Sequence, residues 1–298
     1  MTSLIDRVIT PRVNDLGGGF KVRRALPFHA HKMVGPFIFF DHFGPVDYAP
    51  GEGFDVRPHP HIGLSTVTYM FEGAIHHKDS VGSDLVIRPG AVNWMTAGRG
   101  ITHSERTPDV ERANGQSMHG LQTWVALPKT HEMMEPGFVH HPEDTLPTFE
   151  KNGADIRVLA GEAWGHSSPV EFPWGILYAA IEAPNGASLI LPGELAEERA
   201  LYLVSGAVEI EGETFEEGQM LVLSEGSDIA ATFSPGTKGI ICGGQKMDGK
   251  RLIDWNFVAS DKTLIDEAKA DWEAWIANGY SSERFGTLDE GEHIPLPE

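Results

Sequence analysis

Two short segments carry residue types that bind metal ions: His59-Pro60-His61 and His103-Ser104-Glu105. In each segment two potential ligands stand two positions apart, and on an extended strand such side chains point to the same face. Two strands of this kind, brought together, converge three imidazoles and one carboxylate on one point, while the middle residue of each segment faces away. The spacing therefore predicts a metal site formed by His59, His61, His103 and Glu105.

Either segment alone is weak evidence, because histidines often occupy loops or half-buried, hydrogen-bonded positions. The two segments lie 42 residues apart in the same half of the chain, and together they favour a joint site. Pro60 has no N–H to donate to a ladder, so we expect the first segment at a strand start or at a sheet edge.

The elements that position these residues are short apolar runs separated by turn residues, with 34 Gly and 20 Pro in 298 residues. Short strands with frequent turn signals indicate an all-β sandwich or barrel. The runs expected to be strands are 37–40, 65–70, 84–87, 121–127, 156–159, 175–181, 187–191, 199–204, 220–223 and 239–242.

The two halves of the chain share a rhythm of strand, glycine turn and hairpin, seen around Gly73 and again around Gly206. This pattern predicts two related β-barrels in tandem. The proline-rich stretch between them has little periodicity and is expected to be irregular. The predicted divisions are a metal-binding barrel, a connector, a metal-free barrel, and a helix and tail, at residues 1–130, 131–153, 154–260 and 261–298.

One helix is expected, near the C-terminus, where apolar residues from Leu264 to Ile276 recur at helical spacing. Thr263 with Asp266 resembles a capping box, and Asn278-Gly279 is a stop signal. Its two tryptophans lead us to expect that the helix clasps the two barrels together.

The net charge of −20 is uneven: residues 1–128 hold 12 basic and 12 acidic residues, and residues 129–298 hold 11 and 31. This acidity argues against binding of nucleic acid and of anionic membranes. No apolar stretch is long enough to span a membrane, and the N-terminus lacks an apolar signal core, so a cytoplasmic location is expected. The single cysteine, Cys242, excludes an intrachain disulfide and a cysteine-based zinc site, and its apolar neighbours predict a packed core thiol.

Longer segments resemble the pirin family, a group of bicupins within the cupin superfamily. The segments that carry the resemblance are 35–45, 59–63, 94–105, 120–125, 158–162 and 284–286. The resemblance implies two cupin (double-stranded β-helix, jelly-roll) barrels with a metal in the first, and it places the ligands at the four residues that spacing selects. The general cupin pattern expects a glutamate shortly after the second histidine, where Ser65 and Thr66 stand, and in pirins Glu105 fills that role.

The remaining histidines have less specific interpretations. His42 is predicted either to reach the metal cavity or to shape a turn, and His119 to bond near the barrel mouth. The pairs His76-His77 and His140-His141 are expected to be exposed in a hairpin and in the connector. The second half has no His-x-His, and its glutamates indicate a solvated face or a protein-binding surface.

A mixed set of nitrogen and oxygen ligands suits one divalent transition metal, with Fe(II) expected first and Mn, Ni, Co, Cu or Zn as alternatives. The resemblance implies a quercetin 2,3-dioxygenase-like enzyme that opens a flavonol-type ring with O2, and Glu105 is the expected acceptor of the substrate proton. The alternative is a metal-loaded, redox-sensing regulator that binds a protein partner without turnover. A metal-dependent sugar isomerase is disfavoured, because only Arg57, Arg88 and Arg99 offer anchors for its substrate.

Overall fold

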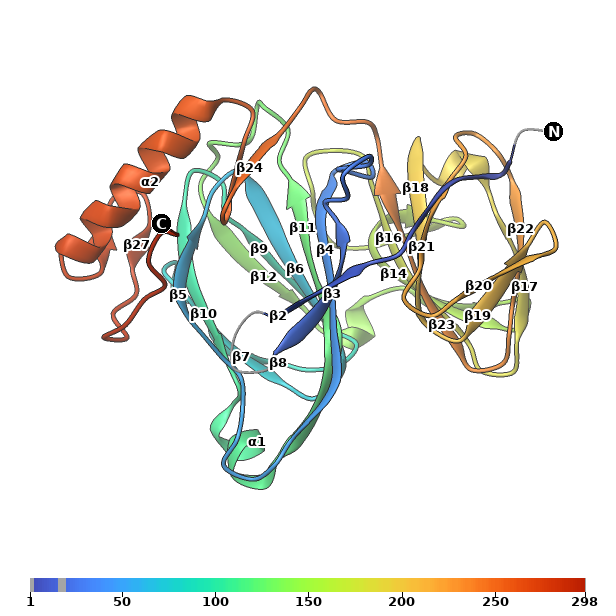
Figure 1. Cartoon of the computed structure of the whole chain (residues 1–298), viewed down its shortest axis with the longest axis horizontal. Helices are drawn as coiled ribbons and strands as arrows, with labels where there is room; N and C mark the ends of the chain where they lie inside the picture. Colours follow the sequence, from blue (N-terminus) through green and yellow to red (C-terminus); the bar gives the residue numbers. More distant parts are fainter. Residues whose placement is uncertain (1–2, 16–19, 298) are drawn as a thin grey trace. The chain divides into compact units, whose positions relative to one another are not determined.

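The computed structural model describes residues 3–15 and 20–297 and divides them into two compact units. The N-terminal barrel unit contains residues 15–21, 43–140 and 248–298, and the C-terminal barrel unit contains residues 1–14, 22–42 and 141–247. The residues outside the described ranges are 1–2, 16–19 and 298. The first two belong to the N-terminus that was considered above for a signal core. Each unit is a β-barrel built mainly from antiparallel strands (Figure 1).

The N-terminal barrel unit has a four-stranded sheet in the order β5-β10-β7-β8, and a second sheet that contains β12-β9-β6-β11. The bounds of these strands are β5 Asp55–His61, β6 Leu64–Glu72, β7 Ile75–Asp79, β8 Asp84–Ile87, β9 Val92–Thr96, β10 Ile101–Arg106, β11 Gln116–Ala126 and β12 Gly137–His141. Its short elements are α1 Asp109–Asn114, β24 Leu252–Asp254, β25 Phe257–Ala259, β26 Ser281–Ser282 and β27 Gly286–Thr287.

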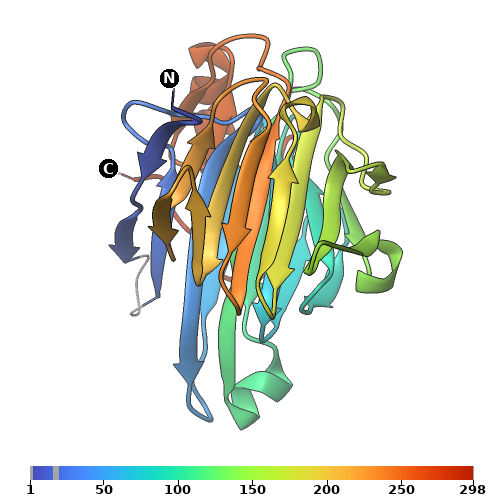
Figure 2. The same ribbon diagram turned by 90° about the vertical axis from the view of Figure 1, so that its right-hand side faces the viewer.

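The C-terminal barrel unit repeats this plan, with a small sheet β17-β22-β19-β20 and a large sheet β1-β21-β18-β23-β16-β14-β13, in which β15 pairs with β14 (Figure 2). Its bounds are β1 Ile5–Ile9, β13 Thr148–Lys151, β14 Ala154–Ala163, β15 His166–Ser167, β16 Ile176–Ala183, β17 Ala187–Leu191, β18 Glu198–Ser205, β19 Ala207–Ile210, β20 Glu213–Glu216, β21 Met220–Leu223, β22 Ile229–Phe233 and β23 Thr237–Gly244. The 3₁₀ helices η1 Glu143–Thr145 and η2 Gly193–Leu195 complete it. Three further strands each contain a boundary between the units within their sequence: β2 Arg12–Asp15, β3 Lys21–Leu26 and β4 Phe37–Tyr48.

The repeated rhythm of the sequence corresponds to equivalent turns. Gly73 follows β6 with a φ of 80°, and Gly206 follows β18 with a φ of 76°. A Cβ at Gly73 would lie 2.5 Å from the Ser117 carbonyl oxygen, and one at Gly206 would lie 2.4 Å from the Thr237 hydroxyl. Both turns therefore need glycine for the same two reasons, its backbone conformation and the close packing.

All ten expected strands are present, and the predicted all-β fold of two barrels is confirmed. The stretch 131–153 is more regular than expected, because β12 and β13 lie within it. The predicted boundary at residue 130 also differs from the compact units. β1 pairs antiparallel with β21, with Ile9 opposite Met220, so the start of the chain joins the C-terminal barrel unit.

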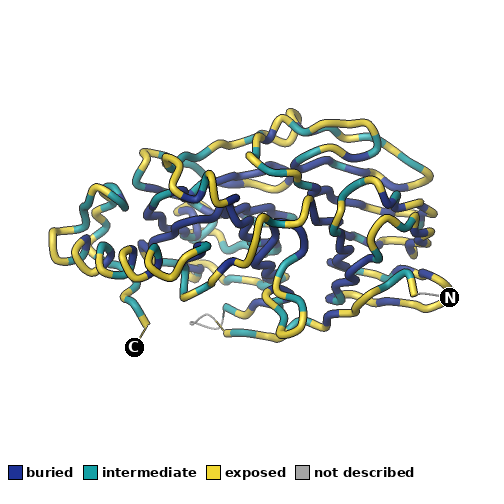
Figure 3. The backbone as a smooth tube through the Cα atoms, turned by 90° about the horizontal axis from the view of Figure 1, so that it is seen from above, coloured by how far each residue is buried: buried dark blue, intermediate teal, exposed yellow. Residues whose placement is uncertain are grey.

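The predicted helix is α2, Lys262–Ala277, and it alternates exposed and buried residues along its length (Figure 3). Its cap differs from the expected one, because the Asp261 side chain accepts a hydrogen bond from the Thr263 N–H at 2.7 Å. Trp272 and Trp275 stack at 4.3 Å between ring centroids and pack against residues of the same unit, including Ile62 and Phe285. The clasp between barrels stays a prediction. Within the described residues no helix is long and apolar enough to cross a membrane.

Candidate metal centre

The four predicted ligands lie on two neighbouring strands of the small sheet in the N-terminal barrel unit. β5 is an edge strand of this sheet, as Pro60 led us to expect, and β10 pairs with it antiparallel, with His103 opposite His59 and Ile101 opposite His61. All four side chains are buried, with exposed fractions between 1% and 8%. A hydrophilic cluster this deep inside a barrel needs partners, because an unpaired buried polar group is costly.

The three imidazoles form one compact group. The ring centroid of His103 lies 4.2 Å from that of His59 and 5.1 Å from that of His61, and one potential ligand atom of each residue lies within 4.8 Å of the others. Trp124 packs its ring at a steep angle against His61, 5.1 Å between centroids. Three of the four predicted ligands are therefore gathered at one point.

Glu105 belongs to a second, overlapping group with His77 and His103, whose potential ligand atoms also lie within 4.8 Å of one another. Between His103 and Glu105 the pairing of β10 with β5 shifts at a bulge, so Glu105 lies opposite Val56 on β5. The regular pairing of β10 with β7 places Glu105 opposite His77. His103 joins the two groups.

Two of the imidazoles are oriented by backbone carbonyl groups. His59 Nδ1 donates to the Arg57 carbonyl oxygen at 2.9 Å, and His61 Nδ1 donates to the Asn256 carbonyl oxygen at 3.0 Å. A carbonyl oxygen only accepts, so each Nδ1 carries the proton and each Nε2 keeps its lone pair for a metal. Such contacts fix both the tautomer and the ring orientation of metal-binding histidines.

His103 supplies the sharpest test of whether the residues fit a metal. Both of its ring nitrogens are buried, and neither has a hydrogen-bond partner among the described residues. A buried imidazole with no partner is unfavourable unless something else occupies a nitrogen. The donor set, three neutral imidazoles and a carboxylate with no thiolate, suits a divalent transition ion, so the residues present fit the group.

Burial sets the protonation states of the site. It lowers the pKa of His59 to about 4, and it lowers the pKa values of His61 and His103 well below their usual range, assisted by the neighbouring imidazoles. Burial raises the pKa of Glu105, although His77 and a hydrogen bond from Thr68 partly oppose this rise. At neutral pH the histidines are therefore uncharged and able to ligate.

The expectation that His77 is exposed is wrong. Its side chain is 3% exposed, its Nε2 lies 3.1 Å from Asp79 Oδ2, and its ring stacks on Phe138 with centroids 4.5 Å apart. Asp79 Oδ1 accepts from the N–H groups of Val81 and Ser83, and the pKa of Asp79 is lowered: burial opposes this change, but the hydrogen bonds from His77 and Ser83 outweigh it. In the sequence, the two-residue spacing of His77 and Asp79 is the signal that these two side chains share one face of a strand.

The other predicted positions have separate roles. His42 is buried in the C-terminal barrel unit, where its Nδ1 lies 2.8 Å from the Tyr202 hydroxyl, so it belongs to neither histidine group. His76 Nε2 lies 2.6 Å from Asp84 Oδ1, and the His119 ring packs against the Phe71 ring with their centroids 4.9 Å apart. Cys242 is fully buried, which raises the pKa of its thiol to about 12 and confirms a packed core residue.

The fold and this cluster define a bicupin with a candidate metal centre in one barrel. The pirin sequence profile matches residues 19–125, and the profile of the pirin C-terminal cupin domain matches residues 178–276. A pirin-like protein of Caulobacter vibrioides is 48% identical, covering 99% of this chain and all of that protein. The chain therefore belongs to the pirin family.

Solved structures show the same architecture. A crystal structure of quercetin 2,3-dioxygenase from Acinetobacter baumannii is 35% identical, with a TM-score of 0.89 over 98% of this chain and 95% of that one. A bacterial pirin from Escherichia coli, solved in complex with nickel(II), is 18% identical with a TM-score of 0.63 over 81% and 99% of the two chains. At that identity the second likeness shows the fold alone.

Proposed function

We propose that the N-terminal barrel unit binds one divalent transition metal through His59, His61, His103 and Glu105. The observation that carries this proposal is His103, a buried imidazole whose two nitrogens have no hydrogen-bond partner in the part of the chain that the structure describes, and which belongs to both groups of potential ligands. The nickel(II) complex of the Escherichia coli pirin supports a metal in this fold, and Fe(II) is the ion we expect for redox chemistry.

We further propose that the chain is a dioxygenase that opens a flavonol-type ring with O2. The likeness to the Acinetobacter baumannii quercetin 2,3-dioxygenase over nearly the whole chain supports this substrate class. When bound, a redox-active metal supplies coordination of substrate oxygens and electron exchange with O2. The protein supplies oriented imidazoles and a carboxylate whose side chains are buried.

Glu105 is the proposed proton acceptor. Its carboxylate is buried and its pKa is raised, chiefly by desolvation, so it is a stronger base than an exposed glutamate. Accepting the proton of a substrate hydroxyl would convert that oxygen into a better electron donor. His77, opposite Glu105 on β7, lies close enough to stabilise the carboxylate before the proton arrives.

Oxygen uptake tests this assignment. Protein loaded anaerobically with Fe(II) is expected to consume O2 when quercetin is added, and the His59→Ala variant treated in the same way is expected to consume far less. Equal uptake by the two proteins would contradict the assignment for this substrate. His76→Ala is the matched control, because it removes an imidazole that pairs with Asp84 outside the cluster.

A second candidate is a metal-loaded regulator that binds a protein partner without turnover. It is favoured by exposed carboxylates on β19 and β20 of the C-terminal barrel unit, at Glu209, Glu213 and Glu216. Rat pirin, 34% identical over 74% of each chain, is a further family member with which to compare partners. Metal-dependent, stoichiometric capture of a partner, with no oxygen uptake, would favour this function over the first.

A further inference from the structure

The bulge in β5 leaves two carbonyl groups outside the regular ladder. Arg57 and Pro58 lie between His59 and Val56, whereas β10 has only Ser104 between their partners. An extra residue of this kind interrupts the ladder and re-aims neighbouring side chains. The pairing with β5 is therefore irregular where His59 and Glu105 leave the backbone, and on this side β10 depends on other contacts, while its pairing with β7 continues in register through Glu105.

Other contacts hold the bulge instead. The Arg57 carbonyl accepts from His59 Nδ1, as described above, and the Pro58 carbonyl accepts from the Ile294 N–H at 2.8 Å. Ile294 belongs to the segment 290–294, which we call the C-terminal strap. Its own carbonyl accepts from Trp272 Nε1 at 3.1 Å, which ties the strap to α2.

The strap also holds the outward face of β10. Ser104 Oγ donates to Glu290 Oε1 at 3.0 Å, and Arg106 donates to Glu290 Oε2 at 2.7 Å and to Glu292 at 2.8 Å. Ser104 and Arg106 are the two neighbours of Glu105, and their side chains leave the strand on the face opposite to it. The Glu290 side chain is 16% exposed and that of Arg106 is 26% exposed, so the ion pair is largely shielded from water.

We propose that Glu290 is a positioning residue for the metal site: by holding Ser104 and Arg106 from outside the barrel, it fixes how β10 presents Glu105 at the bulge. The inference rests on the proposed metal site and adds to it a residue 186 positions beyond Ser104 in the sequence. Groups that hydrogen-bond a metal ligand directly typically change metal affinity 10- to 100-fold, and Glu290, which acts through the neighbours of Glu105, is expected at the lower end of this range.

Nickel(II) titration calorimetry on the full chain tests it. The Glu290→Ala variant is expected to bind Ni(II) about tenfold more weakly than the wild type. Glu273→Ala, the same change on the exposed side of α2, is expected to stay within twofold. The Co(II) absorption spectrum is a second readout, because it reports ligand geometry, and it is expected to change only in Glu290→Ala. Unchanged affinity and an unchanged spectrum in Glu290→Ala would overturn the proposal.

A double-mutant cycle tests the route through Ser104. Ser104→Ala removes only the hydroxyl, and its effect on Ni(II) affinity is expected to be largely lost when Glu290 is already alanine. Additive effects would overturn this route. If Glu290→Ala does not fold, Ser104→Ala alone decides, and unchanged affinity would count against the proposal. Absence of Ni(II) binding by the wild type would instead refute the metal site itself.

Discussion

The two barrels share the same arrangement of strands but place different side chains on the corresponding strands. In the N-terminal barrel unit, β5 and β10 present His59 opposite His103, with His61 one step further along. The same places on β17 and β22 of the C-terminal barrel unit are held by Leu189 opposite Ala231 and by Leu191. The comparison teaches that the barrel provides a pair of inward-facing, adjacent strands, and that the side chains on them decide between a metal site and an apolar core.

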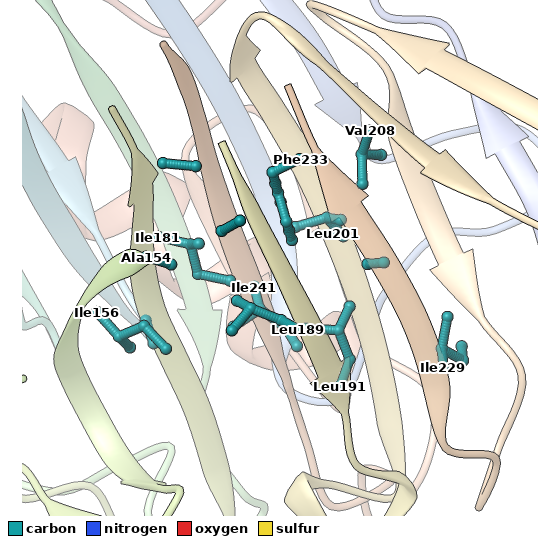
Figure 4. Packing of buried hydrophobic residues seen from close by; sticks show 14 of the residues in the cluster. Ala154, Ile156, Ile181, Leu189, Leu191, Leu201, Val208, Ile229, Phe233 and Ile241 are labelled. Atoms are coloured by element: carbon teal, nitrogen blue, oxygen red, sulfur yellow. The ribbon is translucent and has the colours of Figure 1, made fainter. Parts of the chain in front are cut away.

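The C-terminal barrel unit uses these positions for packing. Leu189, Leu191, Ile229 and Phe233 belong to one buried apolar cluster together with side chains of the large sheet (Figure 4). The inward positions of β17 and β22 alternate strictly with exposed ones, and their pairing has no recorded shift in register. Of these two strand pairs, the one with histidines carries the bulge and the one with apolar residues is regular.

The largest expected effect comes from His103, the residue shared by both ligand groups. The His103→Ala variant is expected to lose Ni(II) binding by at least about 100-fold, because it removes a ligand from each group. Calorimetric titration measures the loss. The His76→Ala control is expected to bind Ni(II) as the wild type does. Wild-type affinity in His103→Ala would contradict the claim that the N-terminal barrel unit holds the metal site.

One substitution in each barrel tests the comparison through the free energy of unfolding. Leu189→Ala is expected to destabilise the protein by about 2–5 kcal/mol, because it leaves a cavity in a close-packed core, while Ni(II) affinity stays unchanged. His59→Leu places an apolar side chain where an imidazole is buried, and in metal-free protein it is expected to cost much less. Denaturant unfolding of both variants, with metal removed, gives the two free energies. Equal costs would contradict the different roles of these equivalent positions.

The pH dependence of the metal-free protein follows from the buried histidines. Because the pKa of His59 is lowered to about 4 in the folded state, the unfolded chain binds more protons between pH 6.5 and 4. Stability is therefore expected to fall as the pH drops through this window, by about 3 kcal/mol from His59 alone. Denaturant unfolding at a series of pH values measures it, and the His59→Leu variant should lose less. A flat profile would show that burial does not keep this imidazole neutral.

The smallest effect is expected from His77, which lies beside the ligands and is held by Asp79. The His77→Gln variant is expected to weaken Ni(II) binding by about tenfold, because Glu105 loses its neighbour on β7. A loss as large as that of His103→Ala would instead make His77 a ligand. The same titration distinguishes these results.

Much of this arrangement could be predicted from the sequence. Alternation at two-residue spacing identified the four inward-facing candidates, and Pro60 identified an edge strand. Two-residue spacing indicates that His77 and Asp79 share a face, but it does not place His77 beside Glu105, because that position depends on the pairing of β7 with β10. The same holds for the Asn256 carbonyl and for Glu290, whose contacts with the ligand strands exist only after the C-terminal segment has packed on the barrel.

The stoichiometry of metal binding tests the central claim most directly. We predict that the wild-type chain binds one Ni(II) per molecule, that the His59→Ala/His103→Ala double variant binds none at that affinity, and that Leu189→Ala still binds one. Two equivalent ions per chain, or one ion retained by the double variant, would contradict a single centre built on β5 and β10.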